Sequence, residues 1–150
     1  PGYRGCRFSG IIFTSEYTLL KHPFFSGKGY RRSSARALPW REASASIARE
    51  KIDQMRIPPL LWSTVPFHPH QHNDPLSNRT PTRAEQKTGF ELFLELRRIF
   101  PEPKIVAAGR IAAEALNHAG IEHTSVRHPS HGGKLEFQRG LLEVEKKLSG

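Results

Sequence analysis

The spacing of hydrophobic positions changes along the chain, and it predicts a different structure in each part. Residues 1–41 have little periodicity and many glycines and prolines, which predicts a long loop with short ordered pieces. A helix is predicted over 43–56, where Ser44 or Ser46 can cap the first turn ahead of a weak apolar stripe. The apolar run 60–65 lies between prolines and is predicted to be a short buried strand.

The second half of the chain alternates helices and strands. Helices are predicted over about 82–100, 110–119 and 135–148, and strands over 104–108 and 123–127. Thr82 and Glu85 have the spacing of a capping box, which marks the start of the first of these helices. The alternation favours a single α/β domain, a three-layer αβα sandwich with a central, mostly parallel sheet. Ligands of such sheets bind at the carboxyl ends of the strands.

Basic residues are concentrated near the amino end. The chain of 150 residues has 23 lysines and arginines against 14 acidic residues, a net charge of +9. Residues 1–41 hold eight of the basic residues and one acid, Glu16. A basic face built by one segment is typical of a site for a polyanion, whereas a solvated basic loop would have the same composition. Four candidate phosphate ligands in this segment are Arg31, Arg32, Arg36 and Arg41.

The composition excludes several classes of protein. A single cysteine, Cys6, excludes a disulfide framework within the chain and a site with four cysteine ligands. No apolar run approaches the ~20 residues that span a membrane, and no signal-peptide pattern opens the chain. We therefore expect a cytoplasmic protein without a membrane partner. Because the chain opens at Pro1 in the middle of a turn motif, we also expect a fragment or a truncated gene product.

A histidine-rich loop follows the predicted strand 60–65. His68, His70 and His72 alternate, so an extended backbone would point them to one side, as metal ligands can be. Pro69 interrupts any such strand, and a polar loop with incidental histidines has the same sequence. We predict no metal site, and a metal-dependent hydrolase is the weakest of three functional hypotheses.

Three loop motifs would meet at the carboxyl edge of the predicted sheet. They are Pro1-Gly-Tyr-Arg-Gly5 with Gly10-Ile-Ile-Phe13, Leu60-Leu-Trp-Ser63 with Asn78-Arg79 and Pro81, and Val126-Arg-His-Pro-Ser130. In this order they resemble the active-site motifs of the uracil-DNA glycosylase superfamily, in its bacterial type-4/5-like branch. The resemblance covers nearly the whole chain. It implies the same αβα sandwich and the hydrolysis of the bond between uracil, or a related deaminated base, and deoxyribose in DNA.

The resemblance also implies roles for individual residues. His128 would be the catalytic donor to the departing base, which is flipped into a pocket and stacked on Phe13. The other base-binding candidates are Gly2, Tyr3 and Ser63. Candidate contacts to the DNA backbone are Asn78, Arg79, Arg127, Ser130, Gly132, Gly133 and Lys134. Leu135 is a candidate for the apolar wedge that fills the vacated position in the stack. The partner would be DNA, bound by a monomer in the bacterial nucleoid, with no cofactor.

Two departures from the family pattern leave a second hypothesis open. Ser63 stands where most members have an asparagine, and a hydroxyl matches the imide edge of uracil less well than an amide does. The residue that positions the attacking water, and the first strand of the sheet, would precede Pro1. Cys6 alone cannot hold the iron–sulfur cluster of the type-4 branch, so none is predicted. The alternative is a catalytically degenerate member that binds nucleic acid.

Overall fold

The amino-terminal half contains short helices joined by long loops. A computed structural model describes residues 4–100 and 102–149 of the chain. Helix α1 (Cys6–Ser9) and helix α2 (Glu16–Lys21) are the short ordered pieces expected in the loop-rich segment. Helix α3 (Ala43–Ile52) confirms the next predicted helix, although it ends four residues earlier than expected.

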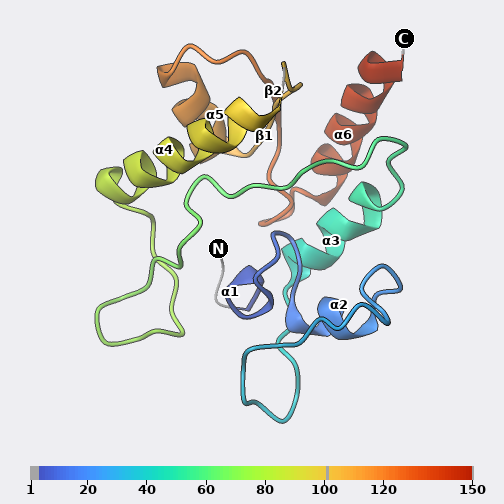
Figure 1. Cartoon of the computed structure of the whole chain (residues 1–150), viewed down its shortest axis with the longest axis vertical. Coiled ribbons are helices and arrows are strands. Elements are labelled where there is room, and N and C mark those ends of the chain that lie inside the picture. The colour runs from blue at the N-terminus through green and yellow to red at the C-terminus, as the bar shows by residue number, and fades with distance from the viewer. Residues whose placement is uncertain (1–3, 101, 150) are drawn as a thin grey trace.

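The carboxyl-terminal half follows the predicted alternation closely. Its elements are α4 (Arg83–Ile99), β1 (Val106–Ala108), α5 (Arg110–His118), β2 (Thr124–Val126) and α6 (Lys134–Ser149). Each lies within about two residues of its predicted bounds, which is the ordinary uncertainty of helix and strand ends. The strands pair in parallel, with Val106 opposite Thr124 and Ala108 opposite Val126, and α5 forms the connection between them (Figure 1).

Helix α4 begins as its sequence predicts but is less buried than its apolar stripe suggests. The Glu85 amide donates to Thr82 Oγ1 at 3.2 Å, and the Thr82 amide donates back to Glu85 Oε2 at 2.7 Å. Leu92, Ile99 and Phe100 on the apolar side remain exposed.

Within the described part of the chain, no helix is both long and apolar enough to cross a bilayer.

The predicted strand over 60–65 is wrong. Among the described residues the sheet contains only β1 and β2, so a three-layer sandwich with a central sheet is not shown. Residues 60–65 run as extended chain that passes between α4 and α3 (Figure 1). An apolar run becomes a strand only when a neighbouring strand pairs with its backbone, and within residues 4–100 and 102–149 this run has no such neighbour.

The segment 60–65 is instead fixed by contact with α4. Gly89 is the one buried residue that α4 contributes among those described, and a Cβ atom there would collide with the carbonyl oxygen of Thr64. We expect Gly89→Ala to lower the free energy of unfolding by about 1–3 kcal/mol, the usual effect of overpacking. Chemical denaturation measures this. Thr88→Ala, at the exposed neighbouring position, should change stability by less than about 0.5 kcal/mol. Equal stability of both variants would contradict the contact.

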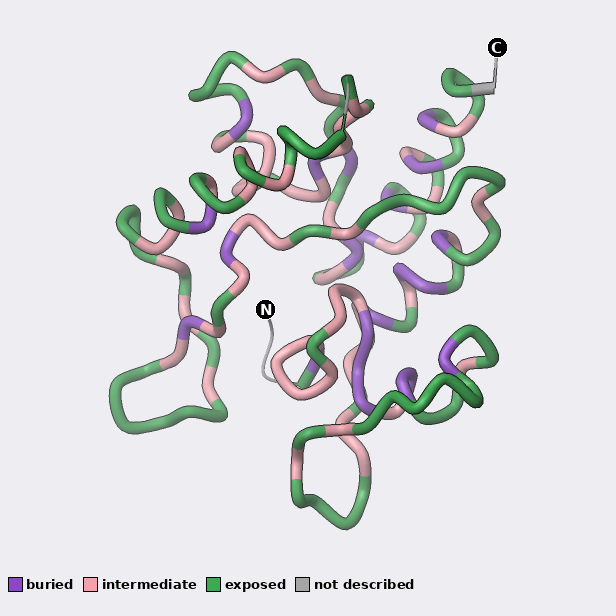
Figure 2. Tube along the Cα trace, viewed as in Figure 1, coloured by how far each residue is buried: buried purple, intermediate pink, exposed green. Residues whose placement is uncertain are grey.

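The main core lies between α3, α6 and β2. Its buried side chains are Ala48, Ile52, Val126, Phe137, Leu141 and Val144. Figure 2 shows the buried positions along the facing sides of α3 and α6, while the loops around residues 26–40 and 70–80 are mostly exposed. Phe13 and Leu61 pack against this core from two loops. The core therefore holds the loop of Phe13 next to the end of β2.

Candidate active site

His128 lies just beyond the carboxyl end of β2, where the chain turns toward α6. The Ser130 amide donates to Nδ1 of His128 at 3.2 Å, and the Ser130 hydroxyl lies 2.7 Å from the same nitrogen. An amide is only a donor, so Nδ1 is an acceptor and the proton of the neutral ring resides on Nε2. Burial lowers the pKa of His128, and the nearby positive charges of Arg127 and His131 lower it further. The ring is therefore a neutral Nε2–H donor near pH 7.

Two glycines allow the backbone to approach His128 closely. Gly109 lies at the carboxyl end of β1 with φ 96°, and a Cβ atom there would be 2.9 Å from Cβ of His128. A Cβ atom on Gly133 would collide with the carbonyl oxygen of His128. Gly132, at φ 77°, has open space where a side chain would be. Gly133 thus serves the local turn, and contacts of Gly132 and Gly133 with DNA phosphate stay predictions.

Phe13 faces His128 although the two are far apart in sequence. The ring centroids are 5.8 Å apart with an interplanar angle of 45°, and Phe137 of α6 packs on Phe13 at 6.1 Å. Phe13 has φ 49°, a left-handed conformation that an L-residue adopts only when its surroundings hold it there. The structure therefore brings together the first and third motifs.

Arg49 supports the loop of Phe13. Its guanidinium donates to Oγ1 of Thr14 at 3.0 Å through Nη2 and at 3.2 Å through Nε, and it contacts the Ile12 carbonyl at 3.4 Å. The same side chain pairs with Asp53 at 3.3 Å. Arg49 thus contacts both neighbours of Phe13. Sequence reasoning missed it, although its position on the buried side of a helix, between Ala45 and Ile52, was an available signal.

Ser63 is engaged within its own loop. Its hydroxyl donates to the Val65 carbonyl at 2.8 Å, which uses the one proton that the side chain has. To recognise a base edge, the Ser63 hydroxyl would have to break its hydrogen bond with the Val65 carbonyl and donate to the base instead. This role stays a prediction. Gly2 and Tyr3, the other predicted base-binding residues besides Phe13, lie outside the described residues.

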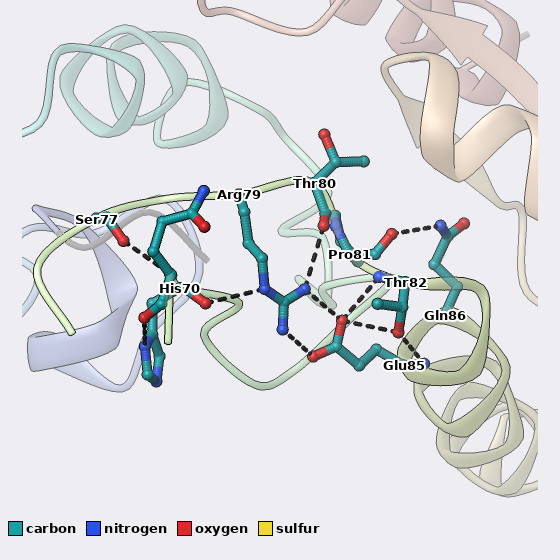
Figure 3. A network of polar contacts seen from close by, with 9 residues as sticks. His70, Ser77, Arg79, Thr80, Pro81, Thr82, Glu85 and Gln86 are labelled. Atoms are coloured by element: carbon teal, nitrogen blue, oxygen red, sulfur yellow. Dashed lines mark hydrogen bonds and ion pairs between the residues drawn. The ribbon is translucent and has the colours of Figure 1, made fainter. Parts of the chain in front are cut away.

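Arg79 anchors the histidine-rich loop to the start of α4. Its guanidinium forms two hydrogen bonds with the Glu85 carboxylate, both at 2.7 Å, and a third with the His70 carbonyl at 2.9 Å (Figure 3). Asn78 beside it is exposed. The arginine expected to contact DNA is therefore built into an internal network. Its contact with phosphate stays a prediction, as does that of Asn78.

This network makes stability sensitive to acid. Hydrogen bonds from Arg79 and then from Thr82 lower the pKa of Glu85 to about 2, below its ordinary value of 4.5. A lowered pKa stabilises the folded state at pH values above 4.5, and that stabilisation is lost as the pH falls toward 2. We expect thermal unfolding to show a steeper loss of Tm with acid for the parent chain than for Glu85→Gln. Parallel Tm-against-pH curves would contradict this assignment.

The remaining predicted DNA contacts lie around the turn that holds His128. Arg127 is exposed and its Nη1 and Nη2 are each 3.4 Å from backbone carbonyls of that turn. Lys134, in the first turn of α6, pairs with Glu50 at 2.8 Å. The side chain of Leu135 is exposed beside it, as a wedge would have to be. Their contacts with DNA stay predictions.

A small cavity opens next to the first motif. It has a volume of about 220 Å³ and is lined by Cys6, Arg7, Gly10, Ile12, Pro66 and His68. Burial raises the pKa of Cys6 to about 11, so its thiol is protonated and a poor nucleophile near neutral pH.

In the histidine-rich loop, the rings of His68 and His70 stack with their centroids 5.7 Å apart. Across the described ranges, no three or more His, Cys, Asp or Glu side chains are grouped to hold a metal ion.

Comparison with family models, with curated proteins and with solved structures found no match to this chain.

Proposed function

We propose that this chain is a DNA glycosylase that hydrolyses the N-glycosidic bond of uracil, or of a related deaminated base, in DNA. The observation that carries the proposal is the pairing of the Phe13 ring with His128, whose Nε2–H is the available donor. An aromatic face and a neutral hydrogen-bond donor are the two groups that a flipped base requires. The first stacks on its plane, and the second stabilises the negative charge that develops on its oxygen.

The reaction separates the base from the sugar with both bonding electrons. The bond from the sugar C1′ to the base nitrogen breaks, and the electron pair leaves with the base, so negative charge spreads to a ring carbonyl oxygen. A donor held at that oxygen lowers the barrier without a full proton transfer. Water then bonds to the electron-poor C1′ and loses a proton to solvent. The His128 imidazole has the protonation state for this role because its Nδ1 is already an acceptor.

The resemblance to the superfamily supports further parts of the proposal. In the αβα sandwich that it implies, β1 and β2 would be neighbouring strands of a wider parallel sheet. The partner would be DNA, bound by a monomeric protein in the cytoplasm. The net charge of +9 supports a polyanionic partner of this kind.

A second candidate function is a nucleic-acid-binding protein of the same type that has lost catalysis. The engagement of the Ser63 hydroxyl by the Val65 carbonyl favours it, because the site then has no side-chain donor prepared for the base edge at that position. The two functions differ in one measurable product, the free base.

The test is release of uracil from a labelled oligonucleotide. Single- and double-stranded substrates with one deoxyuridine are incubated with the full chain in EDTA and then treated with alkali, which cuts at abasic sites. We expect cuts at the uracil position and none in a matched thymine substrate. Binding without cuts would overturn the glycosylase proposal in favour of the second candidate. Cuts that vanish in EDTA would overturn it in favour of a metal-dependent hydrolase.

A further inference from the structure

A basic segment follows α2 along the chain and contains none of the residues that form the candidate active site. Residues 17–41 contain six lysines and arginines and no acidic residue. The chain leaves α2, forms a loop, returns along the helix and forms a second loop before α3 begins (Figure 1). Most side chains of 20–41 are exposed. The segment thus presents concentrated positive charge to solvent.

Arginines in this segment lie against aromatic rings. The guanidinium carbon of Arg36 is 3.8 Å from the ring centroid of Trp40, and that of Arg41 is 3.6 Å from the centroid of Tyr17. Stacking restricts a long side chain and leaves its second face and its N–H edge available. Because both arginines are exposed, that face and that edge can meet a base or a phosphate.

The loop after α2 carries a second cluster of rings and charge. Phe24 and Tyr30 both pack edge-on against the buried Phe25, with centroids 5.1 and 5.3 Å from it. Lys28 lies 4.0 Å from the centroid of Phe24. Phe24 and Tyr30 nevertheless remain 54% and 45% exposed. Exposed rings held rigidly among cations are a stacking platform for unpaired bases.

The buried carboxylate of Glu16 fixes the returning loop in place. Its oxygens accept from the Ser34 amide at 3.0 Å, the Ser34 hydroxyl at 2.8 Å and the Trp40 amide at 3.1 Å. Ser33 is tied to the Phe8 carbonyl of α1 by a hydrogen bond of 2.8 Å from its hydroxyl. These hydrogen bonds hold the returning loop in a defined position against α1 and α2.

We propose that Phe24, Lys28, Tyr30, Arg31, Arg36 and Arg41 form a basic aromatic surface that binds single-stranded DNA without sequence preference. Stacking requires unpaired bases, since the faces of paired bases are covered by their neighbours in a duplex. The cations neutralise phosphates, which makes the binding dependent on salt. The proposal shares its DNA partner with the proposed function but does not depend on release of a base.

The test measures binding of a fluorescent oligothymidylate of about 15 nucleotides and of a duplex of the same length, over a range of salt. The ring variant is Phe24→Leu/Tyr30→Leu, which keeps apolar bulk and removes the aromatic faces. The charge variant is Arg36→Gln/Arg41→Gln. The matched control is Arg83→Gln/Lys87→Gln, which removes two exposed charges from α4. Circular dichroism melting checks that each variant folds, and the single variant Phe24→Leu replaces the double one if it does not.

We expect the ring variant to bind single strands about tenfold more weakly, with a small effect on the duplex. The charge variant should reduce the slope of log affinity against log salt by about 1.4, or about 0.7 for each phosphate that is no longer neutralised. The control should change neither. Parental affinity of the ring variant, an equal loss in the control, or tighter binding of the duplex would overturn the proposal. So would equal binding to vesicles of anionic lipid.

The readout is separable from the proposed function. The oligothymidylate contains no uracil, so its binding is measured without release of a base. A chain that fails to release uracil can still confirm the surface, and a chain that releases uracil can still refute it.

Discussion

Replacing His128 with alanine is expected to lower the rate of uracil release by about 10²–10³-fold, the usual effect of losing one preorganised donor to a developing negative charge. The Ser130 amide donates to Nδ1 of this ring, so the proton of the neutral imidazole is on Nε2. That Nε2–H is the donor proposed for the departing base. Single-turnover cleavage of a uracil-containing strand measures the effect. Affinity for the same strand should hardly change.

Ser130→Ala is the control for this prediction. It removes the hydroxyl at 2.7 Å from Nδ1 but keeps the backbone amide that fixes the tautomer. We therefore expect a much smaller loss of rate than for His128→Ala. Equal rates of uracil release by the parent chain and by His128→Ala would contradict the assignment of His128 as the donor.

Replacing Arg49 with methionine is expected to lower the free energy of unfolding by about 2–3 kcal/mol, because it leaves buried acceptors without a donor. Arg49 is 8% exposed and donates to Thr14 Oγ1 and to the Ile12 carbonyl. For a chain of this size the loss corresponds to a fall in Tm of about 4–12 °C. Calorimetry or circular dichroism measures it. Uracil release should fall as well, because the left-handed turn at Phe13 loses its support.

Arg98→Met is the matched control for Arg49. Arg98 pairs with Glu95 at 2.7 Å on the outer side of α4, but its side chain is 74% exposed. An exposed ion pair contributes about 0–1 kcal/mol, so this variant should melt close to the parent. If the two variants melted at the same temperature, the buried position of Arg49 would not be the source of its effect.

Local patterns predicted helices α3 to α6 and the two observed strands well. The capping box of Thr82 and Glu85 placed the start of α4 correctly, because both partners belong to the same turn. The run 60–65 was predicted wrongly for the opposite reason. A strand depends on a distant partner, and hydrophobicity alone describes burial rather than backbone pairing. The contact of Gly89 with Thr64, which fixes that run, joins two segments that no local pattern relates.

The candidate site was predictable in part. His128, Phe13 and Ser63 could be proposed from the motifs, and the structure places the first two side by side. Arg79 was expected to face DNA, but its carboxylate partner Glu85 is six positions away and was interpreted only as part of a helix cap. Arg49 was not proposed at all. A charged residue on an apolar face is informative only when the loop that covers it is known.

Spacing and composition are local properties. They were enough to establish the order of the elements in the carboxyl-terminal half, the concentration of basic charge near the amino end and the residue types available for chemistry. Three features of the site required the folded chain. The ring of Phe13 contacts that of His128, and the Ser130 amide determines which nitrogen of His128 is protonated. Glu16, the single acid of residues 1–41, is buried and accepts a hydrogen bond from the Trp40 amide in the returning loop. Each depends on contacts that spacing does not specify, because hydrogen-bond partners and burial are properties of the packed chain.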